Sequence, residues 1–254
     1  MTRAAKDKLI VALDVDSADR AVPLFDSLRD VVGLFKIGSQ LFTAAGPDIV
    51  RAIIRKGGGV FLDLKFHDIP NTVATAGVEA TRLGVSIFNV HASGGVEMMK
   101  RTAEAVAETA ERERLMKPKV IAVTLLTSLN QASMEQLGIN DKPPTVVARL
   151  TRLAADCGLD GVVASPQEIG IIRETVANRD FLIVIPGIRS SADETQDQRR
   201  TLNAAEAIRA GADYLVVGRP ILNAEDPPGA ARKIVEDIDA AMREVHKPAP
   251  DQRN

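Results

Sequence analysis

In one stretch of the chain an apolar run passes directly into charged residues: Val60-Phe61-Leu62-Asp63-Leu64-Lys65-Phe66-His67-Asp68-Ile69-Pro70. The first half is typical of a buried strand, and the second half places two carboxylates and an ammonium group at its end. Burying an ion destabilises a fold unless the ion is paired and hydrogen-bonded. A lone Asp-x-Lys is most simply explained as a structural or solvated ion pair. Its meaning therefore depends on the rest of the chain.

Short apolar runs recur along the chain, and each is followed by a longer segment with helical spacing. Because the runs are nearly continuous in Val, Ile and Leu, they indicate strands of a parallel sheet covered by helices on both faces. Eight such units in 254 residues predict a closed (β/α)8 TIM barrel, of the α/β class. An open doubly wound sheet is the alternative, but no Gly-x-Gly-x-x-Gly turn follows the first run. The expected strands are Leu9–Leu13, Leu34–Ile37, Val60–Leu64, Ile87–Val90, Val120–Leu126, Gly161–Ala164, Phe181–Ile185 and Tyr214–Val217.

Length and composition fit one barrel better than two small domains. The chain is 45% hydrophobic, which is enough for a substantial core, and no shift in composition marks a domain boundary. We expect residues 1–245 to form a single barrel domain. Residues 246–254 are polar, contain proline and lack a periodic apolar face, so we expect a poorly ordered tail.

Charge and cysteine content exclude several classes of function. With 32 basic and 34 acidic residues, the net charge is −2, so there is no general basic field to hold nucleic acid. The N-terminal region lacks a basic start followed by a long apolar run, which predicts a soluble cytoplasmic protein with no membrane partner. The single cysteine, Cys157, forbids an intrachain disulfide and fits a small core residue near a helix end.

In barrels of this type the active site lies at the carboxyl ends of the strands, so the polar residues there are candidates. They are Asp14 after the first strand, Lys36 in the second, Asp63 and Lys65 after the third, His91 after the fourth and Thr127 after the fifth. The last two strands lead into Pro186-Gly187-Ile188-Arg189 and Gly218-Arg219. Backbone N–H groups and guanidinium groups in those two loops predict a phosphate site.

Over nearly its whole length the chain resembles the orotidine 5′-phosphate decarboxylase family. Asp-x-Lys-x-x-Asp is shared with related sugar-phosphate decarboxylases, whereas His-Asp-Ile-Pro, Leu-Leu-Thr-Ser and Asp197-Gln198-Arg199-Arg200 favour the orotidylate branch. The motifs that carry the resemblance are Ile10–Asp14, Phe35–Gly38, Phe61–Thr72, Asn89–Ala92, Val123–Ser128, Pro186–Arg189 and Val217–Arg219.

The resemblance implies a role for each candidate residue. The charged network would consist of Lys36, Asp63, Lys65 and Asp68, with Asp68 reaching into the active site of a partner subunit, so the chain would act as a homodimer. No cofactor and no metal would be needed. Asp14 and Lys36 would bind ribose hydroxyls, Thr127 the pyrimidine ring, Gln198 both phosphate and base, and Arg219 with the Gly218 N–H the phosphate. Asp63, Ile69, Thr72, Pro186 and Arg189 would complete the substrate pocket.

The reaction implied is decarboxylation of orotidine 5′-phosphate to uridine 5′-phosphate. We expect the Lys65 ammonium to stabilise charge at C6 of the pyrimidine and to protonate it, while Asp63 and Asp68 hold Lys65 charged and aimed. His91 is more simply a hydrogen-bonded core residue, and His67 has no second metal ligand. Two alternatives stay open: a magnesium-dependent decarboxylase of a keto-sugar phosphate, and a catalytically silent sensor of pyrimidine nucleotides.

Overall fold

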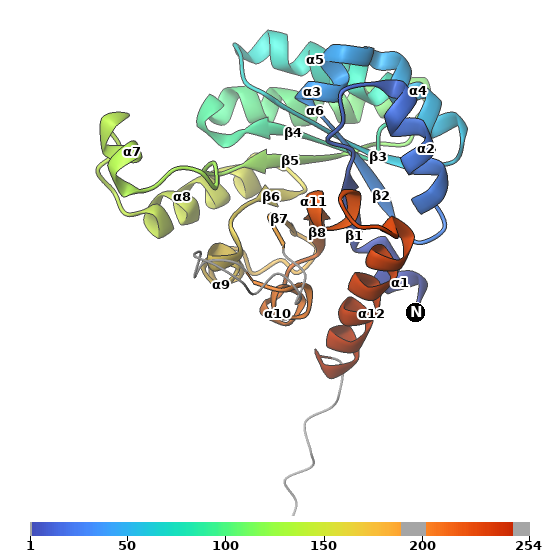
Figure 1. The fold of residues 1–254 in the computed structure, drawn as a ribbon. Coiled ribbons are helices and arrows are strands. Elements are labelled where there is room, and N and C mark those ends of the chain that lie inside the picture. The colour runs from blue at the N-terminus through green and yellow to red at the C-terminus, as the bar shows by residue number, and fades with distance from the viewer. Residues whose placement is uncertain (1, 189–201, 246–254) are drawn as a thin grey trace, which may run out of the picture.

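The computed structural model describes residues 2–188 and 202–245, in which eight parallel strands close into one barrel (Figure 1). Each strand pairs with the next along the chain, and β8 returns to β1 through Leu9↔Leu215. The predicted (β/α)8 barrel is thereby confirmed, and the open sheet is excluded. The strands are β1 (Leu9–Ala12), β2 (Leu34–Gly38), β3 (Gly59–Phe66), β4 (Ile87–His91), β5 (Lys119–Val123), β6 (Gly161–Val163), β7 (Leu182–Pro186) and β8 (Tyr214–Val217).

Helices surround the barrel and connect its strands (Figure 1). They are α1 (Arg3–Asp7), α2 (Ala18–Leu28), α3 (Ser39–Ala45), α4 (Pro47–Arg55), α5 (Pro70–Leu83), α6 (Val96–Glu113), α7 (Gln131–Gln136), α8 (Pro143–Asp156), α9 (Ile169–Thr175), α10 (Ala204–Ala210), α11 (Arg219–Leu222) and α12 (Pro227–Val245). Two 3-10 turns, η1 (Ala92–Gly94) and η2 (Pro166–Glu168), follow β4 and β6. None of the helices in the described ranges is long and apolar enough to cross a membrane.

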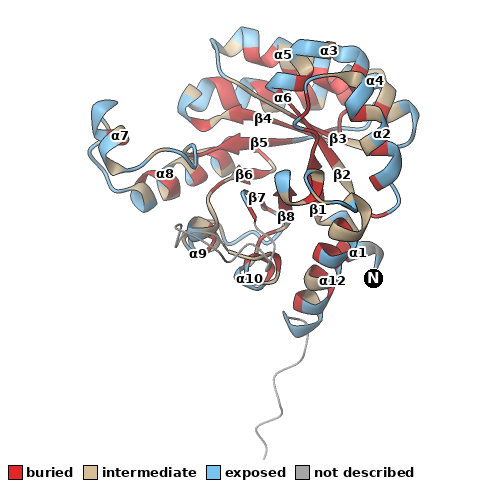
Figure 2. Ribbon diagram, in the orientation of Figure 1, coloured by how far each residue is buried: buried red, intermediate tan, exposed pale blue. Residues whose placement is uncertain are grey.

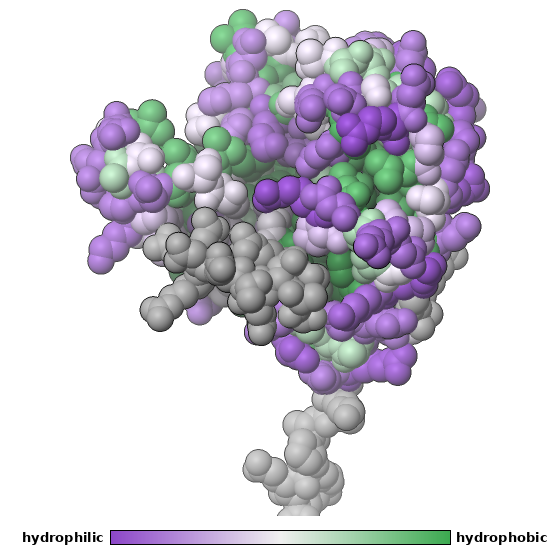
Figure 3. Space-filling model, viewed as in Figure 1, coloured by the Kyte–Doolittle hydropathy of each residue, from purple (hydrophilic) through white to green (hydrophobic). Residues whose placement is uncertain are grey.

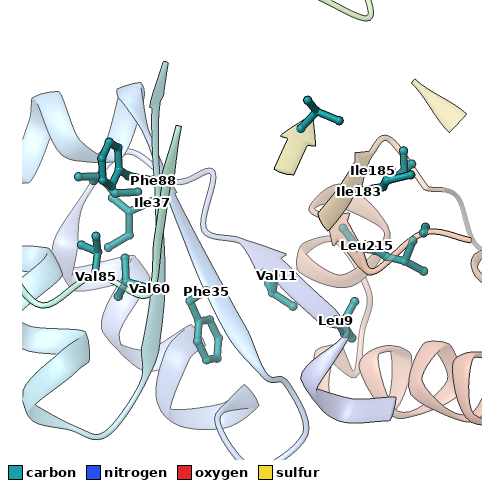
Figure 4. Packing of buried hydrophobic residues seen from close by; sticks show 14 of the residues in the cluster. Leu9, Val11, Phe35, Ile37, Val60, Val85, Phe88, Ile183, Ile185 and Leu215 are labelled. Atoms are coloured by element: carbon teal, nitrogen blue, oxygen red, sulfur yellow. The ribbon is translucent and has the colours of Figure 1, made fainter. Parts of the chain in front are cut away.

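Successive strand residues point alternately into the barrel and out toward the helices, so the protein has two apolar layers. Most strand residues are buried (Figure 2), but in β3 only Val60, Phe61 and Leu62 are. The outward layer packs against the helices and includes Val11, Phe35, Val60 and Phe88 (Figure 4). The barrel interior is filled by Ile10, Ala12, Phe61, Ile87, Ile121, Val184 and Val216. A packed interior confines any ligand to the ends of the barrel.

Helix α5 illustrates how local sequence sets the helices around the barrel. Pro70 occupies the first turn, where a missing N–H does no harm, and Gly84 ends the helix with a left-handed φ of 79°. Gly77 lets α5 approach α6 closely, because a Cβ there would lie 3.1 Å from Val106 Cγ2. This contact fixes the segment that follows the charged end of β3.

Most strand ends differ from the sequence prediction by one residue, and the differences in the third, fourth and fifth strands affect the candidate residues. β3 continues to Phe66, so Asp63 and Lys65 lie within it, and His91 is the last residue of β4. The fifth strand stops at Val123 although the apolar run continues to Leu126, which is 39% exposed. Its neighbour β6 also ends early, at Val163, whose carbonyl accepts the Thr124 N–H at 3.2 Å.

The remaining surface is ordinary for a folded domain. On the face in Figure 3, hydrophilic side chains cover most of the periphery and hydrophobic patches between them are small. Helix α7 stands away from the barrel beyond β5 (Figure 1). Cys157 is buried at the end of α8, which confirms its prediction as a core residue. The tail at 246–254 lies outside the described residues.

Candidate active site

An irregularity in β3 places the lysine of the opening motif. β3 pairs with β4 at Leu62↔Phe88 and again at Phe66↔Val90, so four steps along β3 match two along β4. Within this bulge Lys65 adopts a φ of 51°, in the left-handed region that residues other than glycine rarely occupy. Such a conformation persists only when the surroundings enforce it, and it clusters at functional sites.

The unusual backbone conformation of Lys65 is held by a hydrogen bond to Asn89 in β4, whose side chain is completely buried. Its Oδ1 accepts the Lys65 backbone N–H at 2.8 Å, and its Nδ2 donates to Asp63 Oδ1 at 2.7 Å. The sequence motifs contain Asn89, but sequence reasoning assigned it no role. The available signal was a polar amide inside the apolar run Ile87–Val90, because a buried amide must find hydrogen-bond partners.

Four of the predicted side chains form one chain of alternating charge. Lys65 Nζ donates to Asp63 Oδ1 at 2.6 Å, and Asp63 Oδ2 lies 3.3 Å from Lys36 Nζ. Lys36 Nζ also lies 3.0 Å from Asp14 Oδ1. The side chains of Asp63 and Lys36 are only 12% and 11% exposed, so their charges are paired largely away from water.

Three of these four side chains, Asp14, Lys36 and Asp63, line a cavity of about 830 Å³ at the carboxyl ends of the strands, a size typical of small-molecule sites. Lys65 is not among the lining residues and is joined to the cavity through its hydrogen bond to Asp63. The cavity lining also includes Pro186, Gly218 and Arg219. Gly218 follows β8 and lies close to Asp14, because a Cβ on it would be 3.5 Å from Asp14 Oδ2. The structure therefore brings residues from β1, β2, β3, β7 and β8 together around one space.

Other predicted residues lie apart from this cavity. Thr72, in the first turn of α5, and Thr127, in the loop after β5, are exposed and are not among the residues lining it. Asp68 is also exposed, and its Oδ1 accepts the Ile69 N–H at 2.6 Å. Ile69 is 67% exposed although it is apolar. The predicted residues Arg189 and Gln198, together with the Asp197–Arg200 motif, lie outside the described residues.

Two histidines lie beside the charged chain, with ring centroids of His67 and His91 5.2 Å apart. Burial lowers the pKa of His91, and the nearby His67 and Lys65 lower this pKa further, while Asp63 opposes the shift. His91 is therefore held neutral more readily than an exposed histidine. In the described ranges, no three His, Cys, Asp or Glu side chains gather in a way that could hold a metal ion.

Fold and site together define a (β/α)8-barrel protein with a charged, hollow mouth at the carboxyl ends of its strands. Comparison with known proteins narrows this class: the family model described as "Orotidine 5′-phosphate decarboxylase / HUMPS family" matches residues 7–234. The chain belongs to this family.

Individual relatives share most of the chain. A protein of Syntrophotalea carbinolica named orotidine 5′-phosphate decarboxylase is 54% identical over 240 residues, covering 94% of this chain and 98% of the relative. A Geobacter sulfurreducens protein of the same name is 53% identical, with 94% and 99% covered. The crystal structure of orotidine 5′-phosphate decarboxylase from Lactobacillus acidophilus matches with a TM-score of 0.80 at 33% identity, covering 91% of this chain and 98% of that one.

Proposed function

We propose that this chain is a carboxy-lyase that converts orotidine 5′-phosphate to uridine 5′-phosphate. The observation that carries the proposal is the Asp14–Lys36–Asp63–Lys65 chain beside the cavity. Two relatives that are 54% and 53% identical to this chain bear the name of that activity. The family model's description also prints the name HUMPS, whereas the curated relatives described above bear the name orotidine 5′-phosphate decarboxylase.

The chemistry requires electrostatic stabilisation rather than a covalent intermediate. When the bond between C6 and the carboxylate breaks, carbon dioxide leaves and the electron pair stays on C6. The Lys65 ammonium stabilises this charge and then donates its proton to C6, which gives uridylate and a neutral amine that regains a proton from water. Asp63 aims the ammonium, since its carboxylate accepts the Lys65 Nζ hydrogen bond at 2.6 Å.

The other residues grip the parts of the substrate that do not react. Arg219 and the Gly218 N–H hold the phosphate at the mouth of β8, together with Arg189, while Asp14 and Lys36 bind the ribose hydroxyls. Gln198 bridges phosphate and base, and Pro186 lines the pocket. Ile69, Thr72 and Thr127 lie outside the cavity lining of the single chain, and their proposed contacts form when substrate is bound. Binding energy from the phosphate contributes to the reaction because it is used to orient the pyrimidine ring against Lys65.

The active unit is a homodimer in which Asp68 of one subunit completes the site of the other. Supporting this, Asp68 and the apolar Ile69 are exposed side by side, and no ion pair links Asp68 to Lys65 in the described part of the chain. We also infer that residues 1–245 act as one domain, because the last helix, α12, packs against α1 and α2 at the start of the chain. The protein acts in the cytoplasm, without a nucleic-acid or membrane partner.

The test is the loss of orotidylate absorbance, followed with and without EDTA. Cofactor-independent decarboxylation predicts the same turnover in both. Loss of turnover on chelation, or turnover of a keto-sugar phosphate in place of orotidylate, would instead favour the magnesium-dependent alternative. Uridylate binding without any orotidylate turnover would favour the nucleotide sensor.

A further inference from the structure

We propose that Asn89 is a positioning residue for the decarboxylation. It fixes the position of the Lys65 ammonium and does not touch the substrate. The inference rests on the proposed function. Asn89 is 0% exposed, and both ends of its amide are bonded to residues of the neighbouring strand β3.

The acceptor end of the amide acts on the main chain. Regular pairing between β3 and β4 is interrupted between Leu62 and Phe66, and Asn89 Oδ1 takes up the Lys65 N–H within this gap. The backbone of Lys65 stays in the left-handed region, with φ 51°, where a residue with a Cβ is strained. Without this acceptor, the Lys65 N–H would lose its partner and the main chain would relax toward ordinary strand geometry.

The donor end of the same amide acts on the carboxylate. Asp63 Oδ1 accepts both Asn89 Nδ2 at 2.7 Å and Lys65 Nζ at 2.6 Å. The amide thus fixes the carboxylate to which the ammonium is bonded, as well as the Cα from which the lysine side chain starts. One buried amide therefore holds both the backbone of Lys65 and the carboxylate that accepts its Nζ hydrogen bond.

Positioning of this kind affects the transition state more than substrate binding. The phosphate grip at Gly218 and Arg219 comes from the opposite side of the barrel mouth, after β8, and shares no hydrogen bond with Asn89 among those the structure describes. A displacement of about 1 Å at a reacting group can lower a rate about 100-fold. Changes at Asn89 should therefore lower kcat and leave KM nearly unchanged.

Two variants test the amide: one removes its donor alone and the other removes both contacts. Asn89→Asp keeps the shape and an acceptor oxygen but replaces the N–H donor with a second carboxylate facing Asp63. Asn89→Ser removes the reach needed to bond both partners and adds no charge. Thr102→Val is the matched control, because Thr102 is equally buried and donates to the Met98 carbonyl at 2.7 Å in α6.

The experiment measures kcat and KM for orotidine 5′-phosphate, the Kd for uridine 5′-phosphate and thermal unfolding, using the full chain. We expect kcat to fall about 10- to 100-fold in both Asn89 variants, KM and Kd to change less than about threefold, and Thr102→Val to keep the parent kcat.

Several results would overturn the inference. The first is a kcat within about threefold of the parent in either folded variant. The second is a rise in KM and Kd as large as the fall in kcat, or an equal loss of kcat in Thr102→Val. If Asn89→Asp does not fold, Asn89→Ser decides, and failure of both to fold would make Asn89 a residue of the fold alone. An inactive parent would reject the proposed function as well, whereas an active parent with unaffected variants would reject only the positioning role.

Discussion

Two charged clusters lie at opposite ends of the barrel, and their burial is similar. At the amino ends of β7 and β8, Arg173 pairs with Asp213 at 2.6 Å, and the two side chains are 12% and 23% exposed. At the carboxyl ends, Lys36 pairs with Asp63 at 3.3 Å, with 11% and 12% exposure. Burial of charge alone therefore does not identify a functional site.

The clusters differ in what their charges face. Arg173 also donates to the carbonyls of Phe181 and Gly211, and Asp213 accepts the Ile183 N–H, so this cluster ties α9 to the two strands. Lys36 and Asp63 instead line a cavity. We interpret the first cluster as structural and the second as chemical, and the first three predictions below test this distinction.

The largest effect is expected for Lys65→Ala. Removing the proton donor should lower kcat by about 10⁴-fold or more, because proton transfer and charge stabilisation at C6 are both lost. Uridylate binding should remain, since the phosphate grip is elsewhere. Steady-state assays and calorimetric titration with uridylate measure the two effects. Lys56→Ala, which removes a lysine of similar exposure paired with Asp26, is the control and should keep full activity; near-normal turnover in Lys65→Ala would refute the proton donor.

Mixing two inactive variants tests whether the chemical cluster extends across a dimer. Chains carrying Lys65→Ala combined with chains carrying Asp68→Ala should regain activity at up to about a quarter of all sites, because one site in each mixed dimer is whole. Turnover after subunit exchange measures the recovery. No recovery, once exchange has been demonstrated, would place Asp68 in the site of its own subunit.

The structural cluster should respond in the opposite way. Arg173→Ala should lower the free energy of unfolding by about 3–5 kcal/mol, because Asp213 and two carbonyls lose their partner. Urea unfolding measures this loss, and kcat per folded molecule should not change. Arg149→Ala breaks an exposed pair with Asp141 and should have little effect on either quantity.

The smallest effect concerns pH. The pKa of His91 is lowered by burial, then by His67 and Lys65, against Asp63. The unfolded state therefore binds a proton at His91 more readily than the folded state does. Neutral His91 contributes to folding stability at pH values above its pKa in the unfolded state, and this contribution is lost as the pH falls through its pKa in the folded state. Urea unfolding of His91→Gln at about pH 7.5 and about pH 5.5 should show a flatter pH dependence than the parent. An unchanged dependence would contradict the shift, and His67→Gln should reduce it only in part.

The sequence predicted most of the barrel because the physical cause is local. Each run of buried aliphatic residues forms a strand. Eight alternating strand-helix units bury these strands by closing into a barrel. The same reasoning found Asp14, Lys36, Asp63 and Lys65, because strand ends share one edge. Two outcomes depended on tertiary contacts and were missed: the bulge at Lys65, which needs the amide of Asn89, and the early end of β5 beside the short β6.

The distinction between the two clusters is tested most directly by kcat per folded molecule, measured side by side for Lys65→Ala and Arg173→Ala. Our account predicts that Lys65→Ala falls to background turnover of orotidylate while Arg173→Ala, though less stable, stays near the parent value. Equal losses in the two variants, or a larger loss in Arg173→Ala, would contradict it.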